Sequence, residues 1–127
     1  MIPKNLRQEG QSAETLAADY LKQRNYRILE RNYRINGGEI DIIAQEGNTI
    51  CFIEVKMRRT PTFGTPFEAV PKTKMQKIIQ VAMYYLNSKK IGNSQARFDV
   101  VAVTPQDGSF KVDLLKNAFW LDEAVGY

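Results

Sequence analysis

Residues 36–56 have the sequence NGGEIDIIAQEGNTICFIEVK, and this stretch decides the fold. Two runs rich in Ile, Val and Phe, at 39–46 and 49–56, are separated by Gly47-Asn48. Glycine at the first position of a two-residue loop is typical of a type II′ turn, whose twist matches that of the flanking antiparallel strands. The pattern therefore predicts a β-hairpin in which Glu46 faces Thr49.

The predicted register brings charged residues together at the end of the hairpin away from the turn. Asp41 is expected opposite Glu54, and Glu39 opposite Lys56. Because side chains alternate between the two faces of a sheet, all four are expected on one face. The other face is expected to carry six apolar side chains: Ile40, Ile42, Ala44, Cys51, Ile53 and Val55.

Two carboxylates that face each other across strands require an explanation. Like charges directly opposite destabilise a sheet, and carboxylates among apolar residues are costly to desolvate. A bound cation would remove both costs, and oxygen ligands of this kind suit Mg²⁺. Lys56, two residues after Glu54, would then stabilise charge on a phosphate or help to polarise a water. The alternative is a solvated polar strand end in which Lys56 neutralises Glu54, and the pattern alone leaves both interpretations open.

The composition is that of one ordinary globular domain, expected to extend over residues 1–127. The chain is 43% hydrophobic and has a formal net charge of +4, which favours an anionic partner. No apolar run is long enough to span a membrane, and residues 1–5 lack the apolar core of a signal peptide. No membrane partner is therefore expected. A single cysteine cannot form an intramolecular disulfide, which fits the expected cytoplasmic location.

The chain contains no histidine. This excludes Ser-His-Asp and Cys-His catalysis, and zinc sites built from cysteine and histidine. The one cysteine, Cys51, lies on the apolar face of a predicted strand and is interpreted as a small core residue rather than a nucleophile. Any chemistry must therefore use carboxylates, lysine, tyrosine or a bound metal.

Apolar periodicity and turn residues predict the elements before and just after the hairpin. Residues 7–24 predict a helix that starts at residue 7 or at an N-cap on Ser12 and ends at Asn25. Residues 26–34 predict a strand. The loop at 57–66 is expected to be followed by a short helical turn. The buried stripe of the helix is expected to contain Ala13, Leu16, Ala17, Tyr20 and Leu21.

A second long helix is predicted from Pro71, which fits the first helical position, to about Ser88. The strand at 96–103 is almost continuously apolar, so burial on both faces is expected. Strand 49–56, this helix and strand 96–103 form a βαβ unit, which predicts parallel strands. Residues 105–108 predict a turn and 109–115 a final strand. The apolar stripe of the helix is expected to contain Met75, Ile78, Ile79, Ala82, Met83 and Leu86.

Charged residues outside the hairpin are further candidates for a site. Glu14 borders the stripe of the first helix, where helix geometry alone favours a solvated glutamate. Arg58 and Arg59 directly follow the hairpin, and a basic loop beside carboxylates suits contact with phosphates, although a plain surface connection fits equally well. Lys74 lies early in the second helix and is expected to meet either phosphate or solvent.

The segments Gly38–Ala44 and Phe52–Arg58 together resemble the PD-(D/E)xK nuclease superfamily. More closely, the chain resembles the bacterial YraN family, also called UPF0102, of endonuclease-like relatives of archaeal Holliday-junction resolvases. The most specific feature is Gly-Glu-Ile-Asp with Glu-Val-Lys beginning thirteen residues after Asp41. The one departure from the superfamily motif is Ile40, which stands where the motif has proline. The resemblance also covers the helix around Glu14, the strands at 25–32 and 97–101, the helix at 74–86 and residues 117–119.

This resemblance implies a restriction-endonuclease-like α/β fold, with an αβββαβ core and a central mixed sheet flanked by helices. It implies that Glu14, Asp41 and Glu54 are metal ligands, and that Asp41, Glu54 and Lys56 are catalytic. The helix that carries Glu14 is then expected to approach the carboxylate face of the hairpin. Arg58, Arg59 and Lys74 would contact nucleic acid, with Glu39 as a possible accessory residue.

The function implied is hydrolysis of phosphodiester bonds in DNA, dependent on Mg²⁺ or Mn²⁺, with branched or structured DNA as the substrate class. A homodimer is one option, since cutting two strands symmetrically suits two-fold symmetry. Two alternatives stay open. One is a nucleic-acid-binding module that does not cleave and acts through a partner, and the other is a structural or interaction protein with solvated carboxylates.

Overall fold

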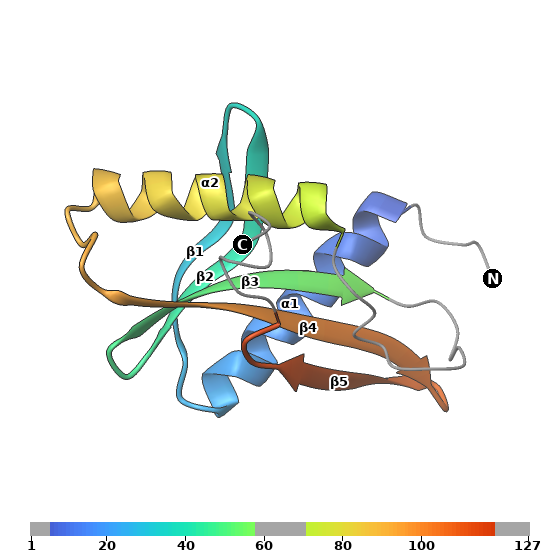
Figure 1. Cartoon of the computed structure of the whole chain (residues 1–127). Helices are drawn as coiled ribbons and strands as arrows, with labels where there is room; N and C mark the ends of the chain where they lie inside the picture. Colours follow the sequence, from blue (N-terminus) through green and yellow to red (C-terminus); the bar gives the residue numbers. More distant parts are fainter. Residues whose placement is uncertain (1–5, 58–70, 119–127) are drawn as a thin grey trace.

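A computed structural model describes residues 6–57 and 71–118, and for residues 6–12 the backbone alone (Figure 1). The elements follow the predicted order of one helix, three strands, a helix and two strands. The predicted segments at 58–70, with Arg58 and Arg59, and the tail at 119–127 lie outside the described residues. The bounds are α1 (Leu6–Gln23), β1 (Arg27–Ile35), β2 (Gly38–Glu46), β3 (Thr49–Met57), α2 (Lys72–Ser88), β4 (Gln95–Gln106) and β5 (Ser109–Leu115).

The five strands form one mixed sheet in the order β1-β2-β3-β4-β5. β3 and β4 are parallel and joined through α2, as predicted, whereas the other neighbours are antiparallel. The two helices cover opposite faces of the sheet, because α1 packs in one apolar cluster and α2 in the other (Figure 1). The αβββαβ core expected of a restriction-endonuclease-like α/β fold is therefore observed.

The central hairpin has the predicted register near its turn. Glu46 pairs with Thr49, and Gly47 has a φ of 59° while Asn48 has no positive φ, as a type II′ turn requires. The β2–β3 ladder then ends at the pair Ile42 and Ile53. The predicted pairs beyond this point are absent from the ladder, so the carboxylates lie where the two strands separate.

The predicted side-chain alternation of β2 is wrong at one position. Ile42 packs in the α1 cluster, but Ile40 packs in the α2 cluster, although regular alternation would place both on one face. The irregularity falls at Asp41, and at Asn32 on β1, which lies between the paired residues Arg31 and Tyr33 and has a φ of 53°. The exchange of faces on β2 and the positive φ on β1 thus occur at the same point of the β1–β2 pair.

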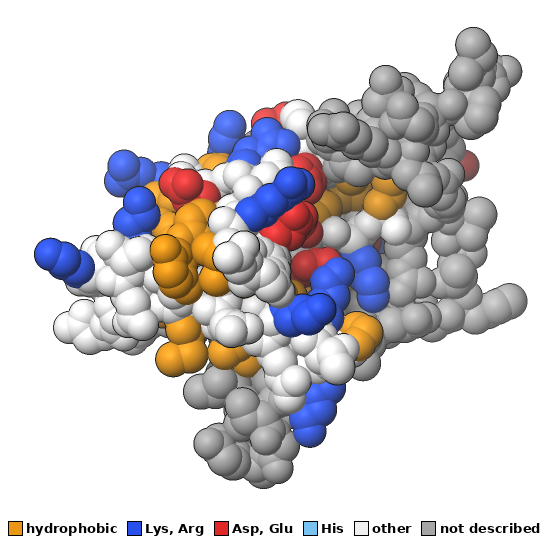
Figure 2. Space-filling view, turned by 90° about the horizontal axis from the view of Figure 1, so that it is seen from above, with side chains coloured by type: hydrophobic (Ala, Val, Ile, Leu, Met, Phe, Trp, Pro, Cys, Tyr) orange, Lys and Arg blue, Asp and Glu red, His pale blue; other side chains and the backbone are white. Residues whose placement is uncertain are grey.

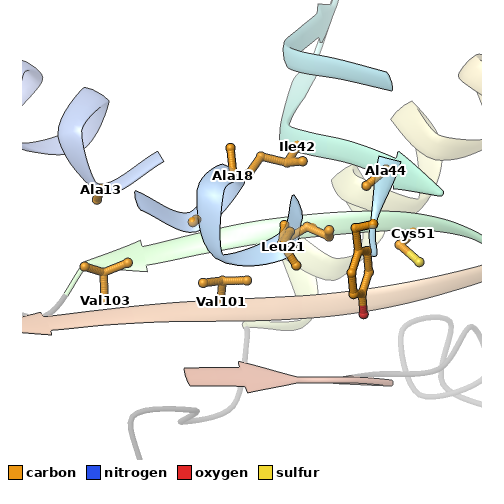
Figure 3. Packing of buried hydrophobic residues seen from close by; sticks show 11 residues of the cluster. Ala13, Ala18, Leu21, Ile42, Ala44, Cys51, Val101 and Val103 are labelled. Carbon is orange, nitrogen blue, oxygen red and sulfur yellow. The ribbon is translucent and has the colours of Figure 1, made fainter. Parts of the chain in front are cut away.

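α1 packs closely against the sheet because its buried side chains are mostly small (Figure 3). Ala13, Ala17 and Ala18 are each at most 2% exposed, and Leu21 is fully buried beside Val101 of β4. The helix begins at Leu6, so Ser12 lies inside it and is not an N-cap. Its end is as predicted, since Asn25 has a φ of 68°.

The end of α1 is a Schellman motif. The Tyr26 N–H donates to the Leu21 carbonyl, and the Asn25 N–H donates to the Lys22 carbonyl. Tyr26 and Leu21 are both buried in the α1 cluster, which supplies the apolar contact that accompanies this motif. The motif fixes where β1 starts relative to the helix.

α2 lies over the opposite face, and its buried residues differ in part from the predicted stripe. Its first helical residue is Lys72, so Pro71 immediately precedes the helix. Met83 is 55% exposed, contrary to prediction. The fully buried side of the helix includes Val81 and Tyr85, which were not predicted. The complete buried set is Ile78, Ile79, Val81, Ala82 and Tyr85.

The β1–β2 hairpin rises past α2 and explains this shift (Figure 1). A Cβ atom built on Gly38 would lie 2.8 Å from Cγ2 of Val81. The ring of Tyr33 on β1 meets Tyr85 edge to face at 5.2 Å. α2 therefore buries the side that faces both the sheet and this hairpin, which leaves Met83 outside.

The predicted turn at 105–108 is shorter in the structure. β4 continues through Pro105 to Gln106, which pairs with Ser109, so only Asp107 and Gly108 form the turn. Both have positive φ, 48° and 77°, the combination required by a type I′ hairpin. In the part of the chain that the structure describes, no helix is long and apolar enough to cross a membrane.

Candidate metal centre

Asp41 lies at the point where β2 and β3 separate. Its Oδ2 accepts a hydrogen bond of 2.8 Å from the Val55 N–H on β3. The carboxylate thus satisfies a backbone donor just beyond the last ladder pair, where a buried N–H would otherwise be costly. No described lysine or arginine forms an ion pair with Asp41.

Glu54 comes from β3 and faces α2. Its side chain is 12% exposed, and its Oε1 lies 2.5 Å from Nζ of Lys74 in the first turn of α2. Burial lowers the pKa of Lys74, but the hydrogen bond and the charge of Glu54 outweigh it, so the pKa of Lys74 is raised. Lys74, placed at the site by the structure, is therefore a firmly charged partner of Glu54.

Glu14 reaches the site from α1, and its side chain is 15% exposed. Nη2 of Arg31 on β1 lies 4.0 Å from the Glu14 carboxylate and donates to Oγ1 of Thr15 at 3.3 Å. The charge of Glu14 contributes to the raised pKa of Asp41, so α1 brings it within electrostatic reach of the hairpin. The prediction that this helix approaches the carboxylate face of the hairpin is wrong, because α1 packs against Ile42 and Ile53 on one face of the sheet while Glu54 meets Lys74 of α2 on the other.

Burial and three neighbouring carboxylates raise the pKa of Asp41. Burial is the main cause that raises the pKa of Asp41 from 3.8 to about 7, and the charge of Glu54 is the next. The Val55 hydrogen bond lowers this pKa, whereas the charges of Glu14 and Glu39 raise it further. Burial and the neighbouring carboxylates thus favour the protonated form of Asp41.

Two predicted hairpin neighbours are arranged differently. Glu39 is exposed and forms an ion pair of 2.7 Å with Arg34, its ladder partner on β1, instead of facing Lys56. Within residues 6–57 and 71–118, Lys56 forms no ion pair. Glu54 is neutralised by Lys74 and not by Lys56, contrary to the solvated-end interpretation.

The donor set fits a divalent cation in chemistry, although the side chains hold other partners. Glu14, Asp41 and Glu54 offer only carboxylate oxygens, the ligands that Mg²⁺ and Mn²⁺ prefer. Among the described residues, no three acidic or cysteine side chains are close enough together to hold a metal ion. Binding would therefore require Glu54 to turn from Lys74 and Glu14 to turn from Arg31.

A second charged cluster, which the sequence pattern did not predict, lies near the Gly47 turn. Asp99 on β4 is 1% exposed, and both its oxygens accept hydrogen bonds from Arg97 at 2.8–3.1 Å. Arg97 also contacts the hydroxyl of Tyr26 at 2.8 Å and pairs with Glu46 at 2.9 Å. The signal in the sequence was the alternation of Arg97 and Asp99 within an apolar strand. The described part of the chain holds no buried side-chain polar atom without a hydrogen-bond partner, so this cluster is structural.

Comparison with known proteins decides the family. Residues 13–103 match the family model described as "Uncharacterised protein family UPF0102". The chain belongs to the UPF0102 family. A UPF0102 protein of Syntrophus aciditrophicus is 47% identical over 120 residues, which cover 94% of each chain. A UPF0102 protein of Caldicellulosiruptor saccharolyticus is 46% identical over 117 residues, covering 91% of this chain and 99% of the relative.

A third relative is similar over almost its whole length, and the range matched by the family model includes every described site residue. A UPF0102 protein of Fusobacterium nucleatum is 42% identical over 123 residues, covering 97% of this chain and 99% of the relative. The matched range 13–103 contains Glu14, Asp41, Glu54 and Lys74. The predicted UPF0102 membership is confirmed, and it rests on the same segments that form the carboxylate cluster.

Proposed function

We propose that this UPF0102 protein is a metal-dependent endonuclease of the PD-(D/E)xK type that hydrolyses phosphodiester bonds in DNA. One observation carries the proposal. Asp41 on β2 is largely buried where two strands separate, within electrostatic reach of Glu54 on β3 and Glu14 on α1, and its burial, followed by these charges, raises its pKa to about 7. Such a costly arrangement is typical of a functional site.

Glu14, Asp41 and Glu54 would hold one or two Mg²⁺ or Mn²⁺ ions. When bound, the metal would polarise the phosphate and lower the pKa of a water. The Val55 N–H would orient Asp41, because its 2.8 Å hydrogen bond fixes one carboxylate oxygen and leaves the other free to bind. Lys56, which forms no ion pair in the described part of the chain, would place its ammonium beside the phosphate.

The surroundings of the site support a nucleic acid as the substrate. Seen from above, basic and acidic side chains lie next to one another over α2 and the adjoining hairpin (Figure 2). Lys74 and Arg34 both lie beside carboxylates of this region, at Glu54 and Glu39. Together with Arg58 and Arg59, they would contact the phosphate backbone. The family resemblance favours branched or structured DNA and allows a homodimer.

A second candidate is a nucleic-acid-binding module that does not cleave. The ion pair of Lys74 with Glu54 favours it, because this lysine already supplies positive charge to the cluster. In this case the positive charge of the chain would still bind phosphates, and a partner would supply any chemistry. The two candidates differ in cleavage and in metal binding.

The test is a cleavage assay on linear, flapped and four-way-junction DNA with Mg²⁺ or Mn²⁺. The variants are Asp41→Asn and, as a matched control, Asp107→Asn, which lies in the β4–β5 turn away from the site. We expect cutting by the wild type and by Asp107→Asn but not by Asp41→Asn. Salt-sensitive binding without cutting of any substrate by the wild type would reject the nuclease and favour the binding module.

A further inference from the structure

Lys74 holds the position that a metal ion at the proposed site would compete for. Its Nζ lies 2.5 Å from Oε1 of Glu54, a carboxylate that is only 12% exposed. The Lys74 side chain itself is 52% exposed, so it reaches inward from the surface of α2. One carboxylate oxygen cannot accept a short ammonium contact and ligate a divalent cation at the same time without strong repulsion between the two cations.

The neighbourhood explains why Lys74 turns inward. Burial opposes its charge, but Glu54, Asp41 and Glu39 all act in the other direction and raise its pKa. Lys74 also lies in the first turn of α2, where the helix dipole disfavours a cation. The negative charge of the carboxylates therefore holds Lys74 in place. A second cation that neutralised these carboxylates would weaken that attraction and release Lys74.

We propose that Lys74 is the built-in counter-ion of the carboxylate cluster and that metal binding releases it to contact a DNA phosphate. This inference rests on the proposed function, because it requires the cluster to bind a divalent cation. The metal takes over the charge of Glu54, and the freed ammonium, on an exposed helix turn beside the site, becomes available to the nucleic acid. Metal binding and DNA binding are then coupled, and the coupling is reciprocal.

Two measurable consequences follow from this exchange. Lys74→Gln removes the competitor, so the variant should bind metal about 3- to 10-fold more tightly than the wild type in the absence of DNA. The wild type should gain one phosphate contact when metal is present. The slope of the logarithm of the DNA-binding constant against the logarithm of the salt concentration should then become steeper by about one. Lys74→Gln should show no such steepening.

The experiment begins with calorimetric titration of MnCl₂ into wild type, Lys74→Gln and the control Lys72→Gln. The control removes the same charge from the same helix turn, but Lys72 forms no ion pair with Glu54 among the described residues. We expect tighter Mn²⁺ binding by Lys74→Gln, and binding by Lys72→Gln within about twofold of the wild type. Lys74→Arg, which keeps the charge, should stay near the wild type.

The second part measures DNA binding of the same proteins by fluorescence anisotropy over a range of salt, with CaCl₂ or with chelator. Equal Mn²⁺ affinity of Lys74→Gln and wild type, or an unchanged salt slope of the wild type with metal, would overturn the Lys74 inference alone. Absence of Mn²⁺ binding by the wild type would overturn both this inference and the metal-dependent nuclease. The first titration thus separates the two failures.

Discussion

The raised pKa of Asp41 predicts that the metal-free protein loses stability as the pH rises. An acid whose pKa is higher in the folded state than in the unfolded state keeps its proton longer when folded. Between the unfolded value of 3.8 and the folded value of about 7, the folded protein therefore binds more protons. The stabilising contribution is complete below the unfolded pKa and is lost as the pH rises through the folded pKa.

The magnitude follows from these two values. Each pH unit between 3.8 and about 7 costs about 1.4 kcal/mol, so the full difference is at most about 4 kcal/mol. Relaxation of a partly buried carboxylate reduces it, and about 2 to 4 kcal/mol is expected. Asp41→Asn keeps an acceptor for the Val55 N–H but cannot ionise, so it should be close to wild type in stability at pH 4 and more stable at pH 8.

The assay is urea unfolding of wild type and Asp41→Asn at pH 4 to 8 with a chelator present. The difference in the free energy of unfolding between the two proteins isolates Asp41, because other carboxylates titrate in both. Asp107→Asn should show a flat difference, since Asp107 is in an exposed turn. A difference for Asp41→Asn that stays constant within about 0.5 kcal/mol over this range would refute the electrostatic reasoning.

Three further predictions concern the frame of the site. Gly38→Ala should lower the free energy of unfolding in urea by about 1–3 kcal/mol, because the new Cβ would lie 2.8 Å from Val81. The control Gly92→Ala makes only an ordinary contact and should change the free energy of unfolding little. Asp99→Ala should cost about 3–5 kcal/mol in thermal or urea unfolding, since it leaves the Arg97 guanidinium buried without its main partner. MnCl₂ should raise the melting temperature of the wild type more at pH 8 than at pH 5, because the ligands must be ionised, and equal shifts would argue against binding at carboxylates.

The hairpin and the βαβ unit could be predicted because local chemistry specifies them. Gly47 at the first loop position set the turn type, and the turn set the register from Glu46 and Thr49 to Ile42 and Ile53. The apolar run of β4 indicated burial on both faces and a parallel partner. These features depend on neighbours in sequence, which a single chain displays directly.

The face exchange at Asp41 could not be predicted in the same way. It coincides with Asn32, a residue of another strand whose positive φ shows no clear signature in the sequence. For the same reason Met83 was assigned to the core, since the β1–β2 hairpin, and not helix periodicity, selects the buried side of α2. Tertiary packing decided both positions.

The sequence predicted that Asp41 and Glu54 lie near each other, but it did not predict the residues with which they pair. Asp41 and Glu54 followed from the hairpin, and Glu14 only from the family resemblance, because helix geometry alone favoured solvent. The partner of Glu54 proved to be Lys74 from α2 rather than Lys56 from the same strand. Periodicity fixes which face a residue takes, but not which of two lysines on different elements comes closer.

The most direct test of the proposed metal centre is calorimetric titration of MnCl₂ into the wild type and into Glu14→Gln, Asp41→Asn and Glu54→Gln, with Asp107→Asn as control. The account predicts saturable binding by the wild type and the control, and binding weakened at least tenfold in each of the three site variants. Absence of binding by the wild type, or binding that survives unchanged in Asp41→Asn, would contradict it.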